Sequence, residues 1–366
     1  MFIMWSWLFL SLLLYCSLPV FVKSYKIDQS CEDKGIMQDV HNAMESAFIM
    51  VQSAIDSLAA SPLDADTIEL LGFLYAKKGD NPAQLIQQGK LAKTLRILRN
   101  INTNMRTEVI GDATPSGYDV IIFCHYDRFV EIDKTQNIWR DSVTDYLLRF
   151  DDVPCRGSTM DRIALAVTIN PVSDPVPVHD ADPETEDDAD PETVGGRVVE
   201  YLKPTQIQLC LWFVDWVKNK EFKQGGDVQK RTKIGRFVIK LAESKGFGLA
   251  QIDAYSLLDK VLLHEMTHGR GAYERTNPIN GWLIQEGLID VPSATSVYQA
   301  LDWAAYGWTG AMKIAKSSKY MYNLGDYWGP DNNADTLALF GSVCKLMNHG
   351  SERRKVDSKG RIVPKI

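Results

Sequence analysis

Two histidines and a glutamate lie together in Leu262-Leu263-His264-Glu265-Met266-Thr267-His268-Gly269, a segment with the pattern H-E-x-x-H. On an α-helix, residues four apart lie on one face, so His264 and His268 can reach the same metal ion. Glu265 lies beside them, where its carboxylate can take a proton from a metal-bound water. The spacing therefore predicts a metal centre that activates water.

The residues before this motif favour a buried helix. An apolar stripe with helical spacing leads into it, and both histidines continue the inward face of that stripe. Gly269 follows at once, in the position of a helix-terminating glycine. The alternative is a pair of core histidines bonded to backbone carbonyls, which leaves the adjacent Glu265 without a role. The stripe consists of Ala254, Leu257, Leu258, Val261 and Leu262.

The first residues predict export. Residues 1–22 are almost entirely apolar, and small or tolerated residues precede Tyr25, so we expect a signal peptide over 1–24 and a secreted, extracellular protein. Lys23 is the first charge, so the positively charged start of a signal peptide is missing. A retained membrane anchor is therefore the alternative, and the sequence does not decide between them.

Cysteine usage agrees with an oxidising compartment. Five cysteines remain beyond the signal, and none is arranged C-x-x-C, which argues against a thiolate zinc site or a redox motif. We expect two disulfides and one unpaired thiol, or an intermolecular bond, with a pairing that the sequence does not give. The five are Cys31, Cys124, Cys155, Cys210 and Cys344.

The formal net charge of −7 argues against nucleic acid as a partner, because phosphates require clustered Lys and Arg. Much of the acidity lies in residues 174–193, where Ala-Asp-Pro-Glu-Thr occurs twice. Such a segment cannot bury apolar area, so we expect a solvated loop inserted in the fold. A calcium site is the alternative, but repeated prolines and absent glycines do not match a compact cation loop.

Periodicity predicts an α+β chain. We expect a mostly helical N-terminal region over 25–106, which packs on a domain over 107–347 or forms a separate lobe, and a C-terminal tail over 348–366. Residues 119–124 and 129–132 are expected to form a strand pair, with further strands at 163–169 and 206–210. Helices are expected at 39–58, 64–76, 82–105, 230–244, 252–268, 304–316 and 334–347.

Several segments together resemble the fungal deuterolysin-like, or aspzincin, secreted metallopeptidases. The His-Glu-Met-Thr-His core is the most specific of them, and the acidic repeat has no recognised counterpart. The resemblance implies a zincin-like fold with a mixed sheet and an active-site helix. The other segments are Tyr25 to Cys31, Ile207 to Phe213, Ala305-Tyr306-Gly307-Trp308 and the segment from Asn333-Ala334-Asp335 to Phe340.

The resemblance also implies a third metal ligand, an Asp three residues before the Tyr of a Gly-Thr-x-Asp-x-x-Tyr-Gly element. Here Trp303 holds that position and the nearest acid is Asp302, four residues before Tyr306. We assign Asp302, because it shares a helical face with Tyr306. Asp290, Glu274 at metzincin spacing and Glu286 at thermolysin-like spacing stay open as alternatives.

These features predict a zinc endopeptidase. Zn²⁺ would be held by His264, His268 and Asp302, Glu265 would act as general base, and Tyr306 would stabilise the oxyanion. The expected partner is a protein or peptide substrate. We expect the protein to be a monomer that makes no membrane contact once the signal is cleaved. The alternative is a secreted zinc-binding or host-interacting protein that has lost catalysis, in which Glu265 would have no purpose. Cleavage preference, natural substrate and propeptide removal are not given by the sequence.

Overall fold

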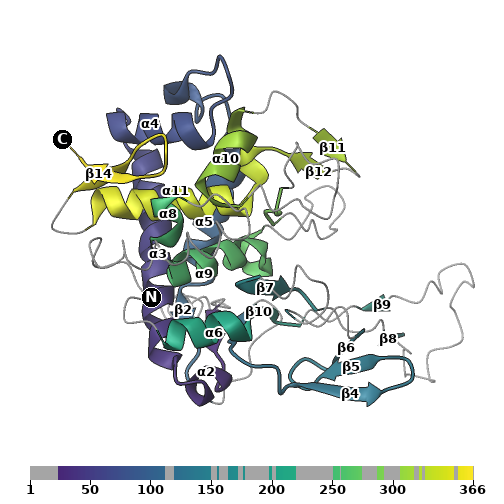
Figure 1. Ribbon diagram of the computed structural model, residues 1–366. Helices are drawn as coiled ribbons and strands as arrows, with labels where there is room; N and C mark the ends of the chain where they lie inside the picture. The colour runs from purple at the N-terminus through teal and green to yellow at the C-terminus, as the bar shows by residue number, and fades with distance from the viewer. Residues whose placement is uncertain are drawn as a thin grey trace, which may run out of the picture.

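The structure is a computed structural model, and the chain has a mixed α+β fold built on a mixed sheet (Figure 1). The predicted α+β class is confirmed. The structure describes residues 24–111, 119–149, 155, 164–171, 176–177, 198–199, 203–219, 250–255, 257–273, 287–291, 306–316, 321–323, 326–349 and 353–365.

The central sheet has five strands in the order β2-β1-β3-β10-β7. The first four strands run parallel, and β7 pairs with β10 in the antiparallel direction. Strand β3 is entirely apolar and buried, as expected of a strand covered on both faces, whereas the buried strand β10 alternates Gln206 and Gln208 with Ile207 and Leu209. The strands are β1 (Ser24–Ile27), β2 (Thr107–Glu108), β3 (Val120–Phe123), β7 (Ala166–Ile169) and β10 (Thr205–Leu209).

The two faces of β10 are covered by different partners, because alternate side chains of a strand point to opposite faces. Ile207 lies beside Thr168 of β7, on the face toward helix α9 (Leu257–His268). Gln208 points to the other face, where it accepts a hydrogen bond from the buried Arg128. Arg128 also pairs with Asp141, at 3.3 Å. This polar contact attaches a three-stranded sheet of β4 (Phe129–Asp133), β5 (Ile138–Asp141) and β6 (Tyr146–Arg149).

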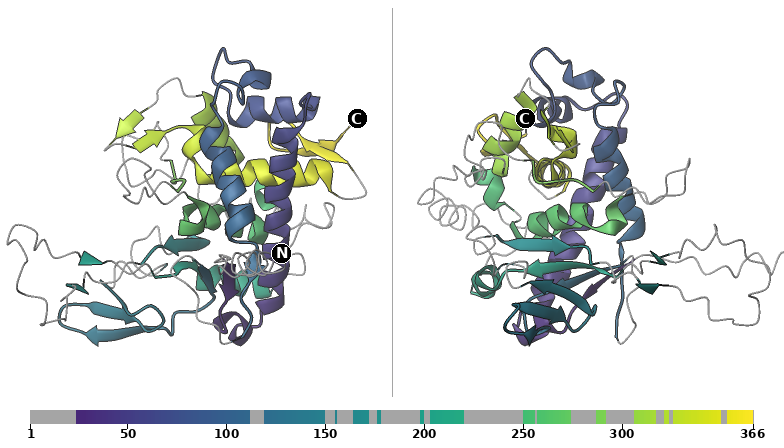
Figure 2. Two further views of the ribbon diagram at one scale, coloured as in Figure 1. Left: turned by 180° about the vertical axis from the view of Figure 1, so that it is seen from behind. Right: turned by 90° about the vertical axis from the view of Figure 1, so that its right-hand side faces the viewer.

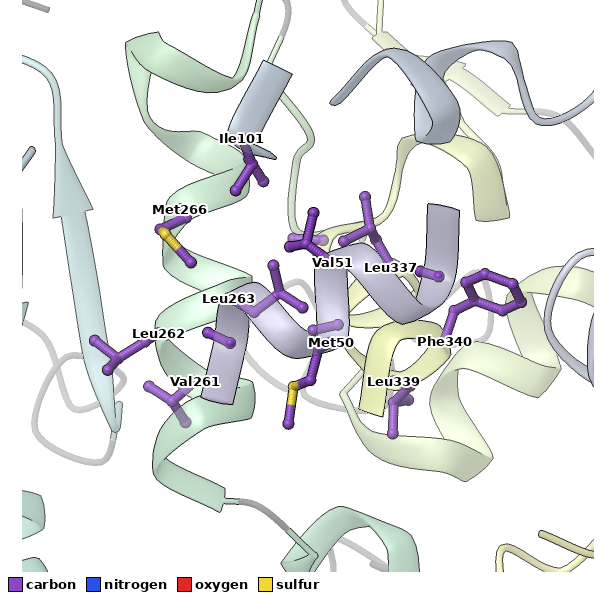
Figure 3. Packing of buried hydrophobic residues seen from close by; sticks show 14 of the residues in the cluster. Met50, Val51, Ile101, Val261, Leu262, Leu263, Met266, Leu337, Leu339 and Phe340 are labelled. Atoms are coloured by element: carbon purple, nitrogen blue, oxygen red, sulfur yellow. The ribbon is translucent and has the colours of Figure 1, made fainter. Parts of the chain in front are cut away.

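Helix α9 lies between the sheet and a layer of helices (Figure 2). That layer contains α3 (Met37–Ala59), α5 (Ala92–Asn104) and α11 (Ala334–Asn348). Figure 3 shows Met50 of α3, Leu263 of α9 and Leu337 of α11 among the apolar side chains that meet there. One hydrophobic cluster runs from Tyr25 to Val356, so the predicted helical region 25–106 packs on the predicted domain 107–347.

Shorter elements complete the described fold. The tail predicted over 348–366 contains a hairpin that lies against α11. The helical elements are α2 (Ser30–Asp33), α4 (Ala65–Leu74), α6 (Leu211–Lys218), α8 (Gln251–Ala254), α10 (Gly307–Lys316), η1 (Pro82–Gln84), η3 (Arg270–Ala272) and η5 (Pro330–Asn332); the hairpins are β8–β9 (Val176–Pro177, Val198–Val199), β11–β12 (Met321–Asn323, Asp326–Trp328) and β13–β14 (Arg354–Val356, Ile362–Pro364).

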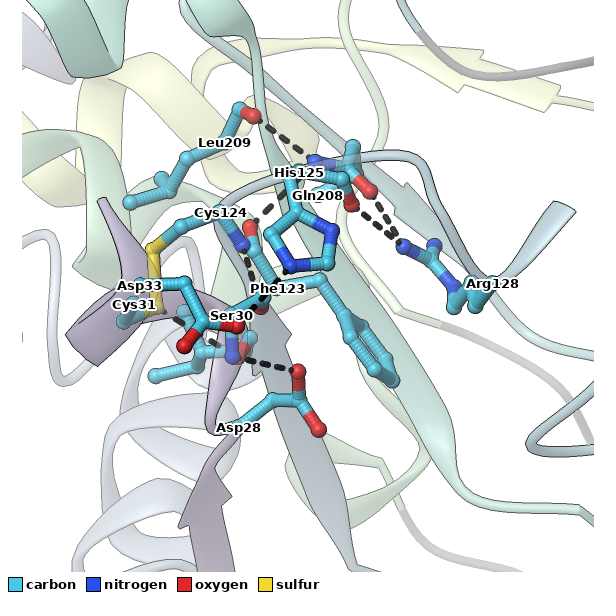
Figure 4. The surroundings of a disulfide bond; sticks show 11 residues. Asp28, Ser30, Cys31, Asp33, Phe123, Cys124, His125, Arg128, Gln208 and Leu209 are labelled. Carbon is cyan, nitrogen blue, oxygen red and sulfur yellow. Dashed lines mark hydrogen bonds and ion pairs between the residues drawn. A yellow bond between two sulfur atoms is a disulfide. The ribbon is translucent and has the colours of Figure 1, made fainter.

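Within the described residues, two disulfides tie chain segments to the sheet, and one buried cysteine, Cys344, is free. This confirms the predicted count. Cys31–Cys124 joins α2 to the end of β3, where His125 contacts Asp33 at 3.3 Å (Figure 4). Cys155–Cys210 lies at the start of α6. Among the described helices, none is long and apolar enough to cross a membrane.

The predicted strand pair is wrong in its partners. Strand β3 does form within the predicted range 119–124, but β3 pairs with β1 and β10, whereas β4 pairs with β5. Two consecutive apolar strands suggested a hairpin, while the disulfide and Arg128 hold them in different sheets. The predicted helix over 82–105 is also shorter: η1 and turns precede α5. The predicted helix over 230–244 lies outside the described residues, as do the predicted signal peptide up to residue 23 and most of the acidic segment 174–193.

Gly269 has another role than the one predicted from the sequence. Its φ is −73°, so it does not adopt the left-handed conformation of a helix-terminating glycine. A Cβ at this position would lie 3.3 Å from Met105 Cε, Met266 O and Thr205 Cγ2. The missing side chain therefore lets the end of α9 approach β10 and the end of α5.

A buried polar contact joins the three central helices. Lys345 of α11 lies 3.1 Å from the Asp259 carboxylate of α9, and the Ser46 hydroxyl of α3 bonds to both. All three residues are buried. Because a buried charge is costly without its partner, the contact fixes the rotation of α9 about its axis.

Lys345→Met should lower the free energy of unfolding by about 3–5 kcal/mol, because it leaves the Asp259 carboxylate buried and unpaired. The double variant Asp259→Leu/Lys345→Met removes both charges and should recover most of the loss. Urea unfolding followed by circular dichroism measures both values. A double variant no more stable than Lys345→Met would contradict this account of the contact.

Candidate metal centre

Helix α9 holds His264, Glu265 and His268 in its last turns. From Leu257 to Thr267 its residues are all buried, and apolar side chains on several sides fix its orientation. The imidazoles of His264 and His268 lie 5.0 Å apart between ring centroids. As predicted from their spacing, the two rings lie together on one face.

Asp290 completes a group of three possible ligands. Its Oδ1 lies 3.0 Å from His264 Nε2 and 3.6 Å from His268 Nε2, and the two Nε2 atoms are 3.3 Å apart. A tetrahedral ion with bonds of about 2.0–2.1 Å holds its ligand atoms about 3.3 Å from one another. Within the described part of the chain, His264, His268 and Asp290 are the one such group that could hold a metal ion.

The other nitrogen of each imidazole faces an acceptor. His268 Nδ1 donates to the Leu288 carbonyl oxygen at 2.7 Å, and His264 Nδ1 lies 3.6 Å from Asp335 Oδ1. A proton on Nδ1 leaves the lone pair on Nε2, which is the nitrogen that faces Asp290. These acceptors thus prepare both histidines to bind an ion through Nε2.

Glu265 points toward the sheet edge beside the two histidines. Its Oε2 accepts a hydrogen bond of 2.6 Å from the Thr168 hydroxyl of β7. Directly after the same strand, Asn170 donates to the His268 carbonyl oxygen at 2.9 Å. Strand β7 and the residue that follows it therefore fix both the carboxylate and the helix end that carry the motif.

Tyr306 lies beside His264 at the centre. Its ring centroid is 5.9 Å from that of His264, and 40% of the residue is exposed. The hydroxyl end of Tyr306 is buried and is hydrogen-bonded to Asp290. This burial and the negative charge of Asp290 both raise the pKa of Tyr306 well above 10. Tyr306 is therefore protonated at neutral pH and can donate a hydrogen bond.

The charged groups of the centre shift one another's pKa. Burial alone lowers the pKa of an imidazole, but the Asp290 carboxylate outweighs it and raises the pKa of His264 well above 6.5. The pKa of His268 is raised by the same balance. Burial alone raises the pKa of Asp290, but the two imidazoles hold it well below its usual range. Without a bound metal ion, the Asp290 carboxylate forms an ion pair with the imidazoles of His264 and His268.

Of the residues proposed from sequence, the structure brings His264, Glu265, His268 and Tyr306 together. Asp302, the assigned third ligand, lies outside the described residues, as do Glu274 and Glu286. The carboxylate beside the imidazoles is that of Asp290, which the sequence left as an alternative. Sequence reasoning missed Thr168, Leu288 and the role of Asp335, although Asp335 belongs to a segment that carried the family resemblance.

No family model matches this chain, and no curated protein and no solved structure matches it either.

The ion pair predicts how the stability of the metal-free protein depends on pH. Each imidazole has a higher pKa in the folded than in the unfolded protein, so its contribution is complete below 6.5 and is lost as the pH rises through the folded pKa. Asp290 has a lower folded pKa, so its contribution is complete above 3.8 and is lost in stronger acid.

The melting temperature of the chelator-treated protein should accordingly fall as the pH rises above neutral. In Asp290→Asn this alkaline loss should be smaller, since the amide carries no charge to raise the imidazole pKa. Scanning calorimetry across a buffer series measures both curves. Parallel curves for the two proteins would contradict the ion pair.

Proposed function

We propose that the chain is a secreted zinc-dependent endopeptidase of the deuterolysin-like type. The observation that carries the proposal is the convergence of two imidazole Nε2 atoms and one carboxylate oxygen at 3.0, 3.3 and 3.6 Å. Two His and one carboxylate form the ligand set of several catalytic zinc sites, which keep a fourth position open. The disulfides are consistent with an oxidising, extracellular compartment.

The same ligand types also hold Fe(II) in oxygenases, where they occupy one face of an octahedron. At angles of about 90° and bonds of about 2.1 Å, such ligand atoms lie about 3.0 Å apart. Two of the three distances here are longer, 3.3 and 3.6 Å. The wider spacing favours the tetrahedral arrangement of zinc, and Glu265 beside the ligands favours hydrolysis.

The residues around the centre have separate tasks in peptide hydrolysis. Bound Zn²⁺ supplies Lewis-acid activation of a water and of the peptide carbonyl. Glu265 accepts the proton of the attacking water on its carboxylate and delivers it to the leaving amine. The Tyr306 hydroxyl donates to the oxygen that becomes negative as the carbonyl is attacked. Thr168 keeps the Glu265 carboxylate directed while it is buried.

The sheet edge supports a peptide as the substrate. Among the described strands, β7 pairs with β10 alone and is the edge strand next to α9. An extended peptide can pair with such an edge through its backbone, independently of its sequence. Since Thr168 of β7 bonds to Glu265, a peptide on this edge would lie within reach of the general base.

Asp290→Ala should weaken zinc binding by orders of magnitude, because it removes one of three protein ligands. Asp302→Ala is the matched control: it removes the carboxylate assigned from sequence and should leave the affinity unchanged. Competition with a chromophoric chelator measures the zinc dissociation constant of each purified variant. If Asp302→Ala released the metal and Asp290→Ala retained it, Asp302 would be the ligand.

Glu265→Gln should retain zinc and lose several orders of magnitude in kcat for peptide hydrolysis, because the amide cannot accept the proton of water. Metal content by atomic absorption and hydrolysis of casein by the wild-type and variant proteins provide the measurement. A zinc-loaded wild type without peptidase activity would leave the zinc site in place and exclude the endopeptidase.

A further inference from the structure

The segment Asn332-Asn333-Ala334-Asp335 runs from the end of η5 into the first residues of α11, and we call it the start of α11. It contacts the chain beside Asp290, the chain beside Tyr306 and the His264 side chain, and the proposed reaction gives it no task. Asn332, Asn333 and Asp335 are at most 6% exposed, so their polar groups are directed inward. Each of them bonds to a residue that flanks Asp290 or Tyr306, or to His264 itself.

Asn333 and its neighbours hold the chain on both sides of Asp290. The Ile289 N–H donates to the Asn332 carbonyl oxygen at 3.0 Å, and the Ala334 N–H donates to the Ile289 carbonyl oxygen at 3.0 Å. On the other side, the Val291 N–H donates to the Asn333 side-chain oxygen at 3.1 Å. Because both neighbours of Asp290 are bonded to α11, the backbone of this partly exposed residue is fixed.

Asp335 holds His264 and the chain beside Tyr306 with one carboxylate. Its Oδ2 accepts the Gly307 N–H at 2.6 Å, and its Oδ1 lies 3.6 Å from His264 Nδ1. The second distance suits an ion pair and is longer than a direct hydrogen bond. Gly307 has a φ of +75°, which a side chain would strain, and it directly follows Tyr306. The position of Tyr306, directly before α10, therefore depends on Asp335.

We propose that Asn333 and Asp335 are the positioning residues of the metal centre: Asn333 places the Asp290 ligand, and Asp335 sets the proton of His264 on Nδ1 and places Tyr306. The inference rests on the proposed zinc site. It assigns no contact with substrate or ion to either residue. If this holds, the start of α11 positions both Asp290, the ligand outside the H-E-x-x-H motif, and Tyr306, the oxyanion donor.

The carboxylate form of Asp335 matters because it offers two acceptor oxygens at once. An amide offers one oxygen, which would remain on the Gly307 N–H, and would turn its NH₂ toward His264 Nδ1. His264 would then carry its proton on Nε2, the nitrogen that faces Asp290, and could not use that nitrogen for the metal. Asp335→Asn should therefore weaken Zn²⁺ binding about 10–100-fold.

Asp253→Asn is the matched control for Asp335→Asn. Asp253 is buried to a similar degree and accepts the next N–H of α10, that of Trp308, at 2.7 Å. Among the described residues, the carboxylates that contact His264 are those of Asp290 and Asp335, not that of Asp253. Its amide variant should bind Zn²⁺ as the wild type does. The two variants thus separate the effect on His264 from the effect of altering the start of α10.

A second pair of variants tests Asn333. Asn333→Ala removes the acceptor of the Val291 N–H and should lower zinc affinity, whereas Asn333→Asp keeps an acceptor oxygen and should restore it. Neither change should alter the tautomer of His264. Thermal unfolding of every variant shows which proteins are folded before binding is compared.

The experiment combines chelator competition for Zn²⁺ with ¹⁵N NMR of the histidine rings in the zinc-loaded full chain. The expected result is a protonated Nδ1 on His264 in the wild type, weaker binding only in Asp335→Asn and Asn333→Ala, and rescue in Asn333→Asp. A wild type that binds no zinc overturns the proposed function and this inference with it. A wild type that binds zinc with an unprotonated His264 Nδ1, or an Asp335→Asn protein that binds equally well, overturns the inference alone. If Asp335→Asn does not fold, the wild-type ring spectrum and the Asn333 pair still decide.

Discussion

The burial of α9 is the constraint on which the rest of the structure depends. A helix surrounded by protein is expected to be apolar on all sides, yet this 12-residue helix carries several ionisable groups. Each of them would cost free energy in the interior unless a partner met it. The partners come from segments far apart in the chain: Ser46 and Lys345 for Asp259, Asp253 for Lys260, Thr168 for Glu265, Leu288 for His268, and Asp290 and Asp335 for His264.

Charge balance connects this packing to metal binding. Three carboxylates, those of Glu265, Asp290 and Asp335, surround the two imidazoles, and the raised pKa of His264 and His268 shows that the cluster favours added positive charge. Two protons on the imidazoles or one divalent cation with neutral imidazoles supply the same charge. A metal would therefore replace protons in a cluster whose carboxylates are already positioned, and its binding would release them.

The sequence predicted the parts of the centre that lie within one helix, because their spacing is set by 3.6 residues per turn. His264, Glu265 and His268 follow from that period alone, and their neighbours Leu258 and Leu262 from the apolar stripe. The third carboxylate lies beyond the helix, and its place depends on the bonds of Ile289 and Val291 to α11, which no periodicity reveals. The predicted pairing of β3 was wrong for the same reason, because strand order depends on long-range contacts such as that of Arg128 with Gln208.

Exposure differs across the centre in a way that sets how it can work. The His264 and His268 side chains are 10% and 18% exposed, whereas that of Asp290 is 43% exposed and Tyr306 as a whole is 40% exposed. Asp290 and Tyr306 are therefore more open to solvent than the two histidines. Burial holds these two residues less firmly than it holds the histidines of α9. Backbone hydrogen bonds to the buried start of α11 replace it, so that a ligand and a hydrogen-bond donor stay accessible and fixed at the same time.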